Sequence, residues 1–376
     1  MLIQTPPMGW NSWNTIGHNI NEDVILENAE ALVKTGLKDC GYNYVVIDDC
    51  WSLRARDKNG YLVADPEKFP RGMKALSDDI HKMGLKFGMY SCCGYKTCAG
   101  YPGSYTHEFQ DAKTFASWDV DLLKYDYCWK PATVSGADLF RRMGEALATC
   151  GRDILFSACT AGKDDTKTWI RSTGAHMWRT TRDINDNWED MKELVAMAQD
   201  SFPYGGANCF PDMDMLIVGM RGEGNVGLGG CTDDEYRLHF SAWAVCGSPL
   251  MIGCDLRKVD DATLNILSNP ALLAIDQDAS GHQPYNLNGD NRDNPIYVRM
   301  LENGDYAIGM FNLSEQTAWA AVDNIALDRM GLLSENKTLL LQDVWSGEEI
   351  YMEDNVYALD LAPHDFRCFR AKVIDA

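Results

Sequence analysis

The sequence predicts a (β/α)8 barrel, a TIM barrel, followed by a C-terminal antiparallel β-sandwich. Over the first three quarters of the 376 residues, short apolar runs alternate with segments of helical periodicity. From about residue 286, short alternating runs are separated by turn residues instead. A doubly wound open sheet is the alternative for the first part, but no glycine-rich phosphate loop follows its first apolar run. We therefore predict a barrel domain over residues 1–285 and a sandwich domain over residues 286–376.

Eight apolar runs are candidate strands of the barrel, and many of them end in a polar or charged residue. They lie at residues 7–13, 42–51, 85–91, 120–126, 153–159, 176–183, 209–215 and 248–255. Between several of these runs the spacing of apolar residues predicts amphipathic helices, at residues 21–41, 70–84 and 138–151. Alternating strands and helices imply a parallel sheet covered by helices, and eight such units imply a barrel. The active site of such a barrel lies at the carboxyl ends of its strands.

The C-terminal quarter contains five alternating runs, and we expect no helix among them. The runs lie at residues 294–301, 305–313, 317–323, 339–345 and 356–371. This pattern is typical of an antiparallel sandwich of about 90 residues. No low-complexity linker separates it from the barrel, which predicts a tightly docked domain.

Charge and composition exclude several classes of function. The formal net charge is −21, from 55 acidic and 34 basic residues, which disfavours binding to nucleic acid or to an anionic membrane surface. No run approaches the roughly 20 apolar residues of a membrane span. The N-terminus lacks the basic and apolar regions of a signal peptide, and 13 cysteines are too few for a disulfide scaffold. We expect a cytoplasmic protein with mainly free thiols, with secretion after removal of a leader as the alternative.

Residues 121–130, DLLKYDYCWK, place a lysine and a carboxylate at the end of one candidate strand. At the two-residue period of a strand, Lys124 and Asp126 point to one face and Tyr125 points to the other. Buried charges are costly unless they are paired. A buried ion pair and a catalytic site are both compatible with this stretch alone.

Carboxylates also end several other candidate strands, and together they are Asp48, Asp49, Asp126, Asp183, Asp212 and Asp214. Six carboxylates on one rim would repel one another, which favours a functional use, and Lys124 and Arg179 would neutralise them in part. Glycoside hydrolysis needs a carboxylate on each side of the scissile bond, whereas divalent-metal hydrolysis needs a tight set of ligands. The seven histidines form no HxH or HExxH motif, although carboxylate-only Mg²⁺ or Ca²⁺ sites have no firm signature. We therefore favour glycoside hydrolysis and expect neither a metal nor a cofactor.

Seven motifs together resemble glycoside hydrolase family 27, the melibiase-like family of α-galactosidases and α-N-acetylgalactosaminidases. In chain order they are MGWNSWN, YNYVVIDDCW, GLKFGMYS, YKTCAGYPGS, VDLLKYDYC, WRTTRDINDNW and PDMDMLIVG. The resemblance implies a (β/α)8 barrel with an antiparallel sandwich, in agreement with the prediction from the residue pattern. It also implies a retaining, double-displacement enzyme that acts on a carbohydrate with a terminal galactose or a related sugar.

The resemblance further implies a role for individual residues. Asp126 would be the nucleophile, and Lys124 would bind a substrate hydroxyl and help to keep Asp126 ionised. Asp183, four residues after Arg179, would be the acid/base and would be protonated for the first step. The other substrate-binding residues would be Trp13, Asp48, Asp49, Tyr90, Arg179 and Asp214.

Each of these interpretations has an alternative. Trp13 and Tyr90 could serve packing alone, and Asp49 could cap a helix. We interpret Asp212 as structural rather than substrate-binding. For the whole chain, the alternative is a non-catalytic carbohydrate-binding protein, which the presence of both predicted catalytic aspartates disfavours.

The chain departs from the family pattern in the loop after the fifth candidate strand. Relatives usually carry Cys-Glu-Trp there, whereas here Cys159 is followed by Thr160 and Ala161. In the family this loop helps to distinguish a 2-hydroxyl from a 2-acetamido group. Tyr127 also stands where many relatives have a small or polar residue, and it could narrow the rim. We expect an exo-acting α-galactosidase, with a β-L-arabinopyranosidase and an α-N-acetylgalactosaminidase as alternatives.

Two cysteines beside the predicted nucleophile, Cys98 and Cys128, match a disulfide of secreted relatives. Cys50 and Cys159 match two further cysteines, whose usual partners are absent. An incomplete set fits a reduced compartment, but a Cys98–Cys128 bridge stays open. A homo-oligomer is compatible with a barrel of this size.

Overall fold

The structure, a computed structural model, contains a parallel barrel; it describes residues 2–334, 336–352 and 354–376. The barrel strands are β1 (Met8–Asn11), β2 (Tyr44–Val46), β3 (Lys86–Cys92), β4 (Leu122–Asp126), β5 (Leu155–Cys159), β6 (Met177–Arg179), β8 (Phe210–Asp212) and β10 (Leu250–Ile252). They form one sheet in the order β10-β1-β2-β3-β4-β5-β6-β8, and a parallel bridge between Leu216 and Ile252 joins its two ends. Each of the eight candidate runs overlaps one of these strands, and only β3 extends beyond its run, by one residue. The predicted (β/α)8 barrel is therefore confirmed.

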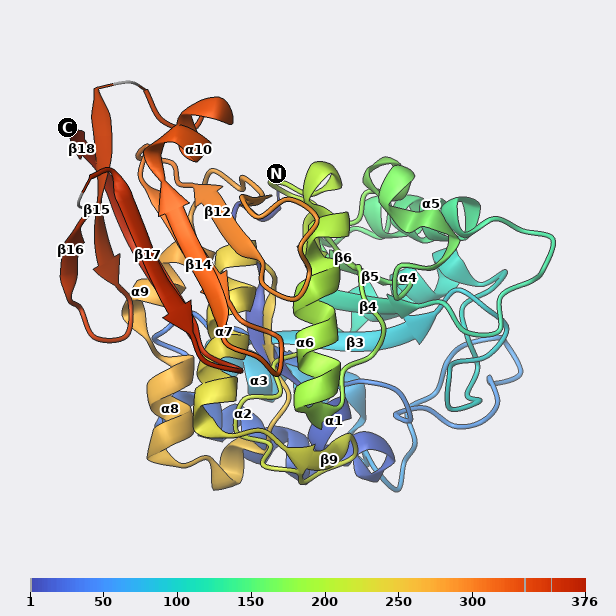
Figure 1. The fold of residues 1–376 in the computed structure, drawn as a ribbon. Coiled ribbons are helices and arrows are strands. Elements are labelled where there is room, and N and C mark those ends of the chain that lie inside the picture. The colour runs from blue at the N-terminus through green and yellow to red at the C-terminus, as the bar shows by residue number, and fades with distance from the viewer. Residues whose placement is uncertain (1, 335, 353) are drawn as a thin grey trace.

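Helices cover the outside of the barrel (Figure 1). They are α2 (Glu22–Lys34), α3 (Gly72–Lys82), α4 (Glu108–Ser117), α5 (Gly136–Ala148), α6 (Trp188–Met197), α7 (Asp233–Cys246), α8 (Asp261–Leu267) and α9 (Pro270–Asp276). The three helices predicted from periodicity are α2, α3 and α5. Two of them are preceded by an N-cap residue whose side chain accepts a hydrogen bond from a backbone N–H of the first turn. The N-cap is Asn21 for α2 and Ser135 for α5. None of the helices in the described ranges has the length and apolar character that a membrane span requires.

Short elements complete the barrel domain. They are α1 (Trp13–Ile16), β7 (Asp186–Asn187), β9 (Gly227–Gly230) and 3-10 turns at Gly17–Asn19, Lys163–Thr168, Ile170–Thr173, Ala198–Asp200, Phe202–Tyr204 and Leu256–Lys258. Helix α1 directly follows strand β1, so Trp13 lies at the carboxyl end of that strand. The turn at Lys163–Thr168 contains two residues with positive φ, Asp164 (57°) and Asp165 (47°). Most of these elements lie in loops that follow a barrel strand, where the predicted site residues also lie.

The C-terminal domain is an antiparallel sandwich, as predicted. Its elements are β11 (Tyr285–Asn286), β12 (Ile296–Met300), β13 (Tyr306–Phe311), β14 (Ala318–Asp323), α10 (Asn324–Arg329), β15 (Lys337–Asp343), β16 (Glu349–Tyr351), β17 (Val356–Leu361) and β18 (Phe366–Asp375). One sheet has the order β11-β12-β13-β18-β15-β16, and β14 pairs with β17 in a second sheet. The prediction of no helix in this region was wrong, because α10 is too short to show a helical period. The boundary between residues 285 and 286 stays a prediction.

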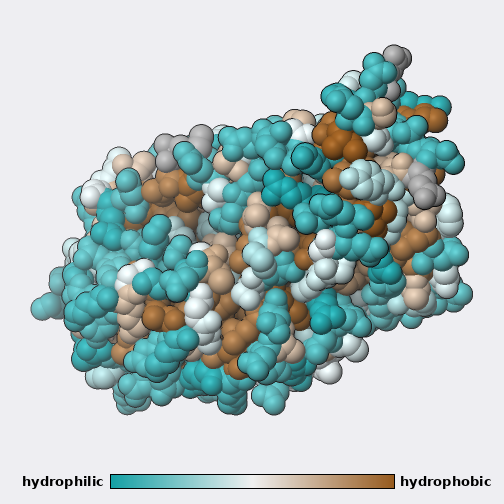
Figure 2. All heavy atoms as spheres, turned by 90° about the vertical axis from the view of Figure 1, so that its left-hand side faces the viewer, coloured by the Kyte–Doolittle hydropathy of each residue, from teal (hydrophilic) through white to brown (hydrophobic). Residues whose placement is uncertain are grey.

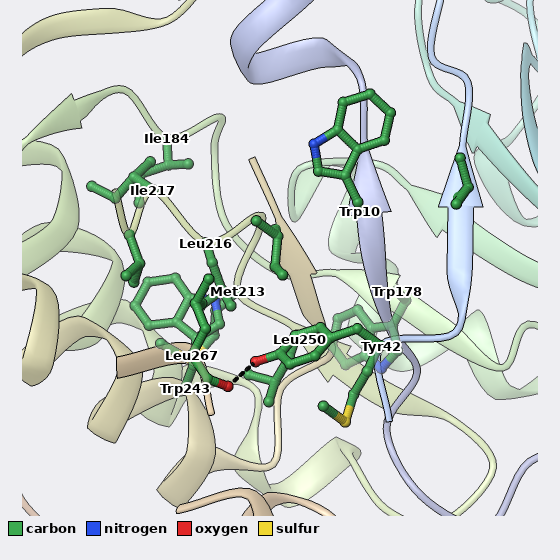
Figure 3. Close-up of a cluster of buried hydrophobic side chains, with 14 of the residues drawn as sticks. Trp10, Tyr42, Trp178, Ile184, Met213, Leu216, Ile217, Trp243, Leu250 and Leu267 are labelled. Carbon is green, nitrogen blue, oxygen red and sulfur yellow. Dashed lines mark hydrogen bonds between the residues drawn. The ribbon is translucent and has the colours of Figure 1, made fainter. Parts of the chain in front are cut away.

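Apolar side chains fill the barrel on both sides of its strands. The interior contains Tyr44, Val46, Leu122, Leu155, Met177, Phe210, Met215 and Met251. Residues one position away, such as Val45 and Leu123, point outward into the layer between strands and helices. Figure 3 shows part of that outer layer, where the Tyr42 hydroxyl donates a hydrogen bond to the Leu267 carbonyl at 2.8 Å. The strands therefore bury apolar side chains on both of their faces.

The sandwich packs directly against the barrel, beside helix α7 in Figure 1. Tyr297 and Phe311, from β12 and β13, belong to the same buried apolar cluster as the outer layer of the barrel. The Tyr297 hydroxyl donates to the Val195 carbonyl in α6 at 2.7 Å. The guanidinium of the buried residue Arg299 donates to the Ala244 carbonyl, near the C-terminus of α7, at 3.2 Å. The two domains are thus joined by a continuous core, as the missing linker predicted.

The outer face of the sandwich is mixed in polarity. Figure 2 shows small hydrophobic patches among hydrophilic residues on the side of the molecule that includes this domain. The most exposed large apolar residues of the domain are Trp319, Ile325 and Tyr351. Apolar residues that are scattered singly over a surface are ordinary in soluble proteins.

Leu250→Ala is expected to destabilise the barrel. Leu250 lies in β10 and is fully buried in the cluster of Figure 3. Its truncation leaves a cavity and should cost about 2–5 kcal/mol, measured as a lower midpoint of urea unfolding. Leu228→Ala is the matched control, because Leu228 is 61% exposed and its truncation should change stability by less than about 0.5 kcal/mol. Equal shifts for the two variants would contradict this assignment of the core.

Candidate active site

One pocket at the carboxyl ends of the barrel strands contains all nine residues that were predicted to act on the substrate. They are Trp13, Asp48, Asp49, Tyr90, Lys124, Asp126, Arg179, Asp183 and Asp214. These residues come from six different strand ends or from the loops that follow them. The pocket therefore has the position that a (β/α)8 barrel gives to an active site. The role of each residue stays a prediction.

Strand β4 brings Lys124 and Asp126 to the pocket by its two-residue period. Tyr125, between them, points outward and packs its ring on Phe140 and Phe156, with centroids 5.3 and 5.8 Å away. The predicted alternation on this strand is confirmed. The ammonium group of Lys124 donates to Asp48 at 2.6 Å, not to Asp126. The ion pair between Lys124 and Asp126 that this stretch suggested as an alternative is thus not observed, and Lys124 pairs instead with Asp48, which follows β2.

Asp48 is held by a set of neighbouring polar groups. Its Oδ2 atom accepts hydrogen bonds from Lys124 and from the side-chain amide of Asn11 at 2.9 Å. Its backbone N–H donates to the Ser12 hydroxyl at 3.0 Å, which connects the ends of β1 and β2. Asp48 is only 3% exposed, so these contacts compensate a buried charge and fix the carboxylate at the bottom of the pocket.

Asp49 orders two loops rather than a helix. One of its oxygens accepts the backbone N–H of Cys50 at 2.7 Å, and the other accepts that of Ala99 at 2.9 Å. The carboxylate thereby connects the loop after β2 with the loop after β3. Burial raises the pKa of Asp49, although these hydrogen bonds act in the opposite direction. The helix-capping alternative is not observed, because the next helix of the described chain, α3, begins only at Gly72.

Asp126 is positioned by three contacts at the mouth of the pocket. The Tyr90 hydroxyl donates to its Oδ2 atom at 2.7 Å, and the backbone N–H of Tyr127 donates to its Oδ1 atom at 2.7 Å. The sulfur of Cys98 lies 3.2 Å from Oδ2. Burial raises the pKa of Asp126, while the positive charge of Lys124 and the hydrogen bond from Tyr90 oppose the rise. Lys124 therefore acts in the predicted direction, but burial has the larger effect.

Arg179 links the two other carboxylates of the rim. Its Nη2 atom lies 2.9 Å from Asp183, and its Nη1 atom lies 2.9 Å from Asp214. Asp214 also accepts the backbone N–H of Ile184 at 2.8 Å. Its φ is 84°, which is uncommon outside glycine.

The protonation state that the structure favours for Asp183 differs from the one that its predicted role requires. The nearby positive charge of the Arg179 guanidinium lowers the pKa of Asp183. An acid/base residue must be protonated for the first step, whereas this arrangement favours the carboxylate. The side chain of Asp183 is 81% exposed in the structure without substrate. A bound sugar would remove water from it, which would favour its protonated form.

Cys98 and Cys128 form a disulfide with Cα atoms 5.3 Å apart, which answers the question that the sequence left open. The bridge joins the loops after β3 and β4 beside Asp126. Among the described residues, Cys98, Asp126 and Cys128 are also the one group of three such side chains close enough to share a metal ion. While the sulfurs are bonded to each other they have no thiolate to offer as a ligand. The other 11 cysteines are free.

Tyr127 is not one of the residues that line the pocket. Its hydroxyl donates to the Asp164 carboxylate at 2.6 Å, and Asp164 also accepts the backbone N–H of Gly136 at 2.9 Å. Thr160 is buried, and its hydroxyl lies 2.7 Å from that of Thr166. Neither Tyr127 nor Thr160 lines the pocket. The expected narrowing of the pocket by Tyr127 is therefore not observed, because its hydroxyl anchors Asp164 in the loop after β5 instead.

Several residues of the site were missed by the sequence analysis. The side-chain amide of Asn11 donates a hydrogen bond to Asp48. The pocket is also lined by Asn14, Cys98, Cys159, Ile184, Met215 and Val226. Asn11 and Asn14 flank Trp13 in the motif MGWNSWN, so their polar side chains beside a predicted strand end were a usable signal. Asp212 does not line this pocket, and its Oδ1 atom accepts the backbone N–H of Asp214 at 2.9 Å.

A pocket with several carboxylates and aromatic rings at the carboxyl ends of a (β/α)8 barrel is typical of a glycoside hydrolase. Comparison with known families agrees with this class. The family model described as α-galactosidase A matches residues 5–278, and the α-galactosidase C-terminal β-sandwich domain matches residues 291–371. The chain therefore belongs to the α-galactosidase family, glycoside hydrolase family 27, as its motifs predicted.

Individual relatives are similar over most of their length. The α-galactosidase of Cyamopsis tetragonoloba is 42% identical over 347 residues, which cover 92% of this chain and 80% of that protein. The crystal structure of α-galactosidase I from Mortierella vinacea has a TM-score of 0.88 at 33% identity, covering 99% of this chain and 98% of that one. The structure of an α-galactosidase from Saccharomyces cerevisiae with raffinose has a TM-score of 0.86 at 27% identity, covering 99% and 98%.

Proposed function

We propose that this protein is an exo-acting, retaining α-galactosidase that releases terminal α-linked galactose from oligosaccharides or glycoconjugates. The observation that carries this proposal is the placement of Asp126 and Asp183 in one pocket of an α-galactosidase fold. Tyr90 and the Tyr127 N–H orient the first carboxylate, and Arg179 orients the second. Two oriented carboxylates are what a double displacement requires.

In the first step, an Asp126 oxygen would attack the anomeric carbon while Asp183 gives its proton to the departing glycosidic oxygen. The bond to the leaving group breaks, and an ester between galactose and Asp126 forms. In the second step, Asp183 would take a proton from water, the water oxygen would attack the anomeric carbon, and Asp126 would leave as a carboxylate. Tyr90 donates a hydrogen bond to Asp126 and would stabilise its negative charge at the start and the end of this cycle.

The remaining pocket residues would bind the sugar. Asp48 and Asp49 would accept hydrogen bonds from hydroxyl groups deep in the pocket, and the ammonium group of Lys124 would donate a hydrogen bond to a hydroxyl oxygen. Trp13 would pack against the apolar face of the sugar ring. Arg179 and Asp214 would bind hydroxyl groups near the scissile bond. These assignments rest on the resemblance and on the position of all six residues on the pocket wall.

The nitrophenyl glycosides of α-galactose, α-N-acetylgalactosamine and β-L-arabinopyranose test the choice of sugar. We expect kcat/KM to be highest for the galactoside, by about tenfold or more. A preference for one of the other two sugars would replace the proposed glycone, and binding without turnover of any of them would favour the carbohydrate-binding protein. Proton NMR of the first galactose anomer released tests the mechanism. Retention gives the α-anomer, and the β-anomer would contradict a double displacement.

Tyr90→Phe is expected to raise the pKa of Asp126. The Tyr90 hydroxyl donates to the Asp126 carboxylate at 2.7 Å and so favours its charged form. Its loss should raise the pKa by about one unit, because a hydrogen bond to a charged group is worth roughly 1.5–3 kcal/mol and one pKa unit corresponds to about 1.4 kcal/mol. Carbon-13 NMR titration of labelled aspartate measures the shift. Tyr44→Phe is the control, since that hydroxyl lies 3.3 Å from Lys86 and makes no hydrogen bond to Asp126.

A cytoplasmic location and a homo-oligomeric state also stay predictions. The 11 free cysteines support a reducing compartment, whereas the Cys98–Cys128 bridge is more typical of an oxidising one. Fractionation of cells that express the protein tests the location. Light scattering of the purified protein tests the oligomeric state, and a mass of 42.1 kDa would identify a monomer.

A further inference from the structure

The Cys98–Cys128 disulfide lies beside the carboxylate of Asp126. The sulfur of Cys98 is 3.2 Å from the Oδ2 atom of Asp126. One ligand atom each from Cys98, Cys128 and Asp126 lies within 4.8 Å of the other two. Two sulfurs and one carboxylate oxygen therefore lie close together beside the pocket, which Cys98 and Asp126 line.

This bridge is accessible to reductants. Cys98 is exposed and Cys128 is half-buried, so a small thiol can approach the sulfur of Cys98 from solvent. Exposed disulfides are more readily reduced than buried ones. The bridge is also the one disulfide in the described part of a chain whose other 11 cysteines are free.

The three side chains match the preferences of zinc. Thiolate sulfur binds Zn²⁺ at about 2.3 Å and carboxylate oxygen at about 2.0–2.2 Å, in tetrahedral geometry. At those bond lengths neighbouring ligand atoms lie roughly 3.5–3.8 Å apart. The Cys98 sulfur and the Asp126 oxygen are already 3.2 Å apart, and the two sulfurs, which are bonded to each other in the disulfide, would separate once that bond is broken. A site with three protein ligands leaves its fourth position open to water.

We propose that reduction of the Cys98–Cys128 disulfide creates an inhibitory site for Zn²⁺ or a related thiophilic cation. A dithiol reductant loses two electrons and two protons and becomes a cyclic disulfide. The protein disulfide accepts these electrons and protons, its S–S bond breaks, and two thiols form. The cation then binds both sulfurs and the Asp126 carboxylate, and the two thiol protons are released to water. In this state the Asp126 oxygen is coordinated and cannot attack a sugar. The loss of activity rests on the proposed function of Asp126, whereas the binding of the cation does not.

Cadmium binding tests the site without any use of enzyme activity. One sample of the protein is kept oxidised. A second sample is reduced with a dithiol, which is then removed under nitrogen. Both samples are titrated with Cd²⁺. The thiolate-to-cadmium charge-transfer absorbance is recorded in the ultraviolet. We expect the reduced protein to bind one additional equivalent, because the other cysteines are the same in both forms. Circular dichroism checks that the reduced protein remains folded. Equal titrations of the two forms would overturn the proposal.

Variants assign the site to its residues. Cys98→Ser and Cys128→Ser should each remove the additional equivalent, whereas Cys150→Ser, at a half-buried free cysteine, should retain it. Asp126→Asn should retain the thiolate-to-cadmium charge-transfer absorbance, because both sulfurs remain, but its affinity for Cd²⁺ should be about tenfold weaker. An additional equivalent that persists in Cys98→Ser would place the metal elsewhere and overturn the proposal, as would unchanged affinity in Asp126→Asn.

Zinc inhibition tests the consequence for activity. Zn²⁺ should reduce galactoside turnover by the reduced protein at least about tenfold and leave the oxidised protein nearly unaffected. Each form is compared with its own activity in a chelator. If the untreated protein turns over no galactoside, the proposed function fails, but the cadmium titration still decides on the metal site. Cadmium binding to Cys98, Cys128 and Asp126 with full turnover in Zn²⁺ would overturn the inhibitory role.

Discussion

Asp126→Asn is expected to lower galactoside turnover by about 10⁴-fold or more and to leave the fold intact. The amide cannot form the ester with galactose, whereas its size and its contacts with Tyr90 and the Tyr127 N–H are compatible with the carboxylate site. The measurement is kcat/KM for nitrophenyl α-galactoside, together with the melting temperature. Asp138→Asn is the control, because that carboxylate lies on α5 with 60% of its side chain exposed, and its loss should leave turnover unchanged.

Chemical rescue separates the nucleophile from a residue that is merely required. Asp126→Gly leaves a space beside the anomeric carbon, and azide ions can occupy it. Azide should restore turnover of an activated galactoside and yield β-galactosyl azide, with inverted configuration, because only one displacement then takes place. Wild-type activity of Asp126→Asn, or an α-azide product, would remove Asp126 as the nucleophile.

Asp183→Asn is expected to slow the reaction according to the basicity of the leaving group. Raffinose-type sugars need a proton on the departing oxygen, so their turnover should fall by about 10²–10⁴-fold. A dinitrophenyl galactoside has a leaving group that departs without a proton, so formation of its galactosyl ester should change little. The measurement is a plot of log kcat/KM against the pKa of the leaving group, which should be steeper for the variant than for the wild-type protein.

A neighbouring ion pair provides the control for Asp183. Asp190 accepts hydrogen bonds from Arg182 and from the Asn185 backbone on the same part of the chain, outside the pocket. Asp190→Asn should affect all substrates equally, because it can act only on the local structure. An equal loss for every leaving group in Asp183→Asn would show that Asp183 supports Arg179 and is not the proton donor.

The sequence was sufficient to predict the barrel because its strands carry two signals at once. Buried parallel strands form nearly continuous apolar runs, and functional carboxylates follow directly where the strands end. Both signals coincide at β2, where Asp48 and Asp49 follow the buried residue Val46. The convergence of these carboxylates in one pocket then follows from the geometry of the barrel.

Other features depend on contacts that no local pattern contains. Tyr127 was expected to narrow the rim, but its hydroxyl donates to Asp164, which lies 37 residues further along the chain. The pairing of Lys124 with Asp48 could not be distinguished from a pair with Asp126, because both carboxylates face the same side of the barrel. The low pKa of Asp183 follows from the orientation of Arg179. Helix α10 has only six residues, which is less than two turns.

The continuous core between barrel and sandwich has a consequence for how the protein can be divided. The Arg299 side chain donates to a carbonyl near the C-terminus of α7, and the Tyr297 hydroxyl donates to a carbonyl in α6. Both helices therefore pack against the sandwich. A fragment that ends after the barrel would present the apolar surface of these helices to water. The non-catalytic domain is therefore a built-in folding partner for the catalytic one, and the two should melt in a single cooperative transition.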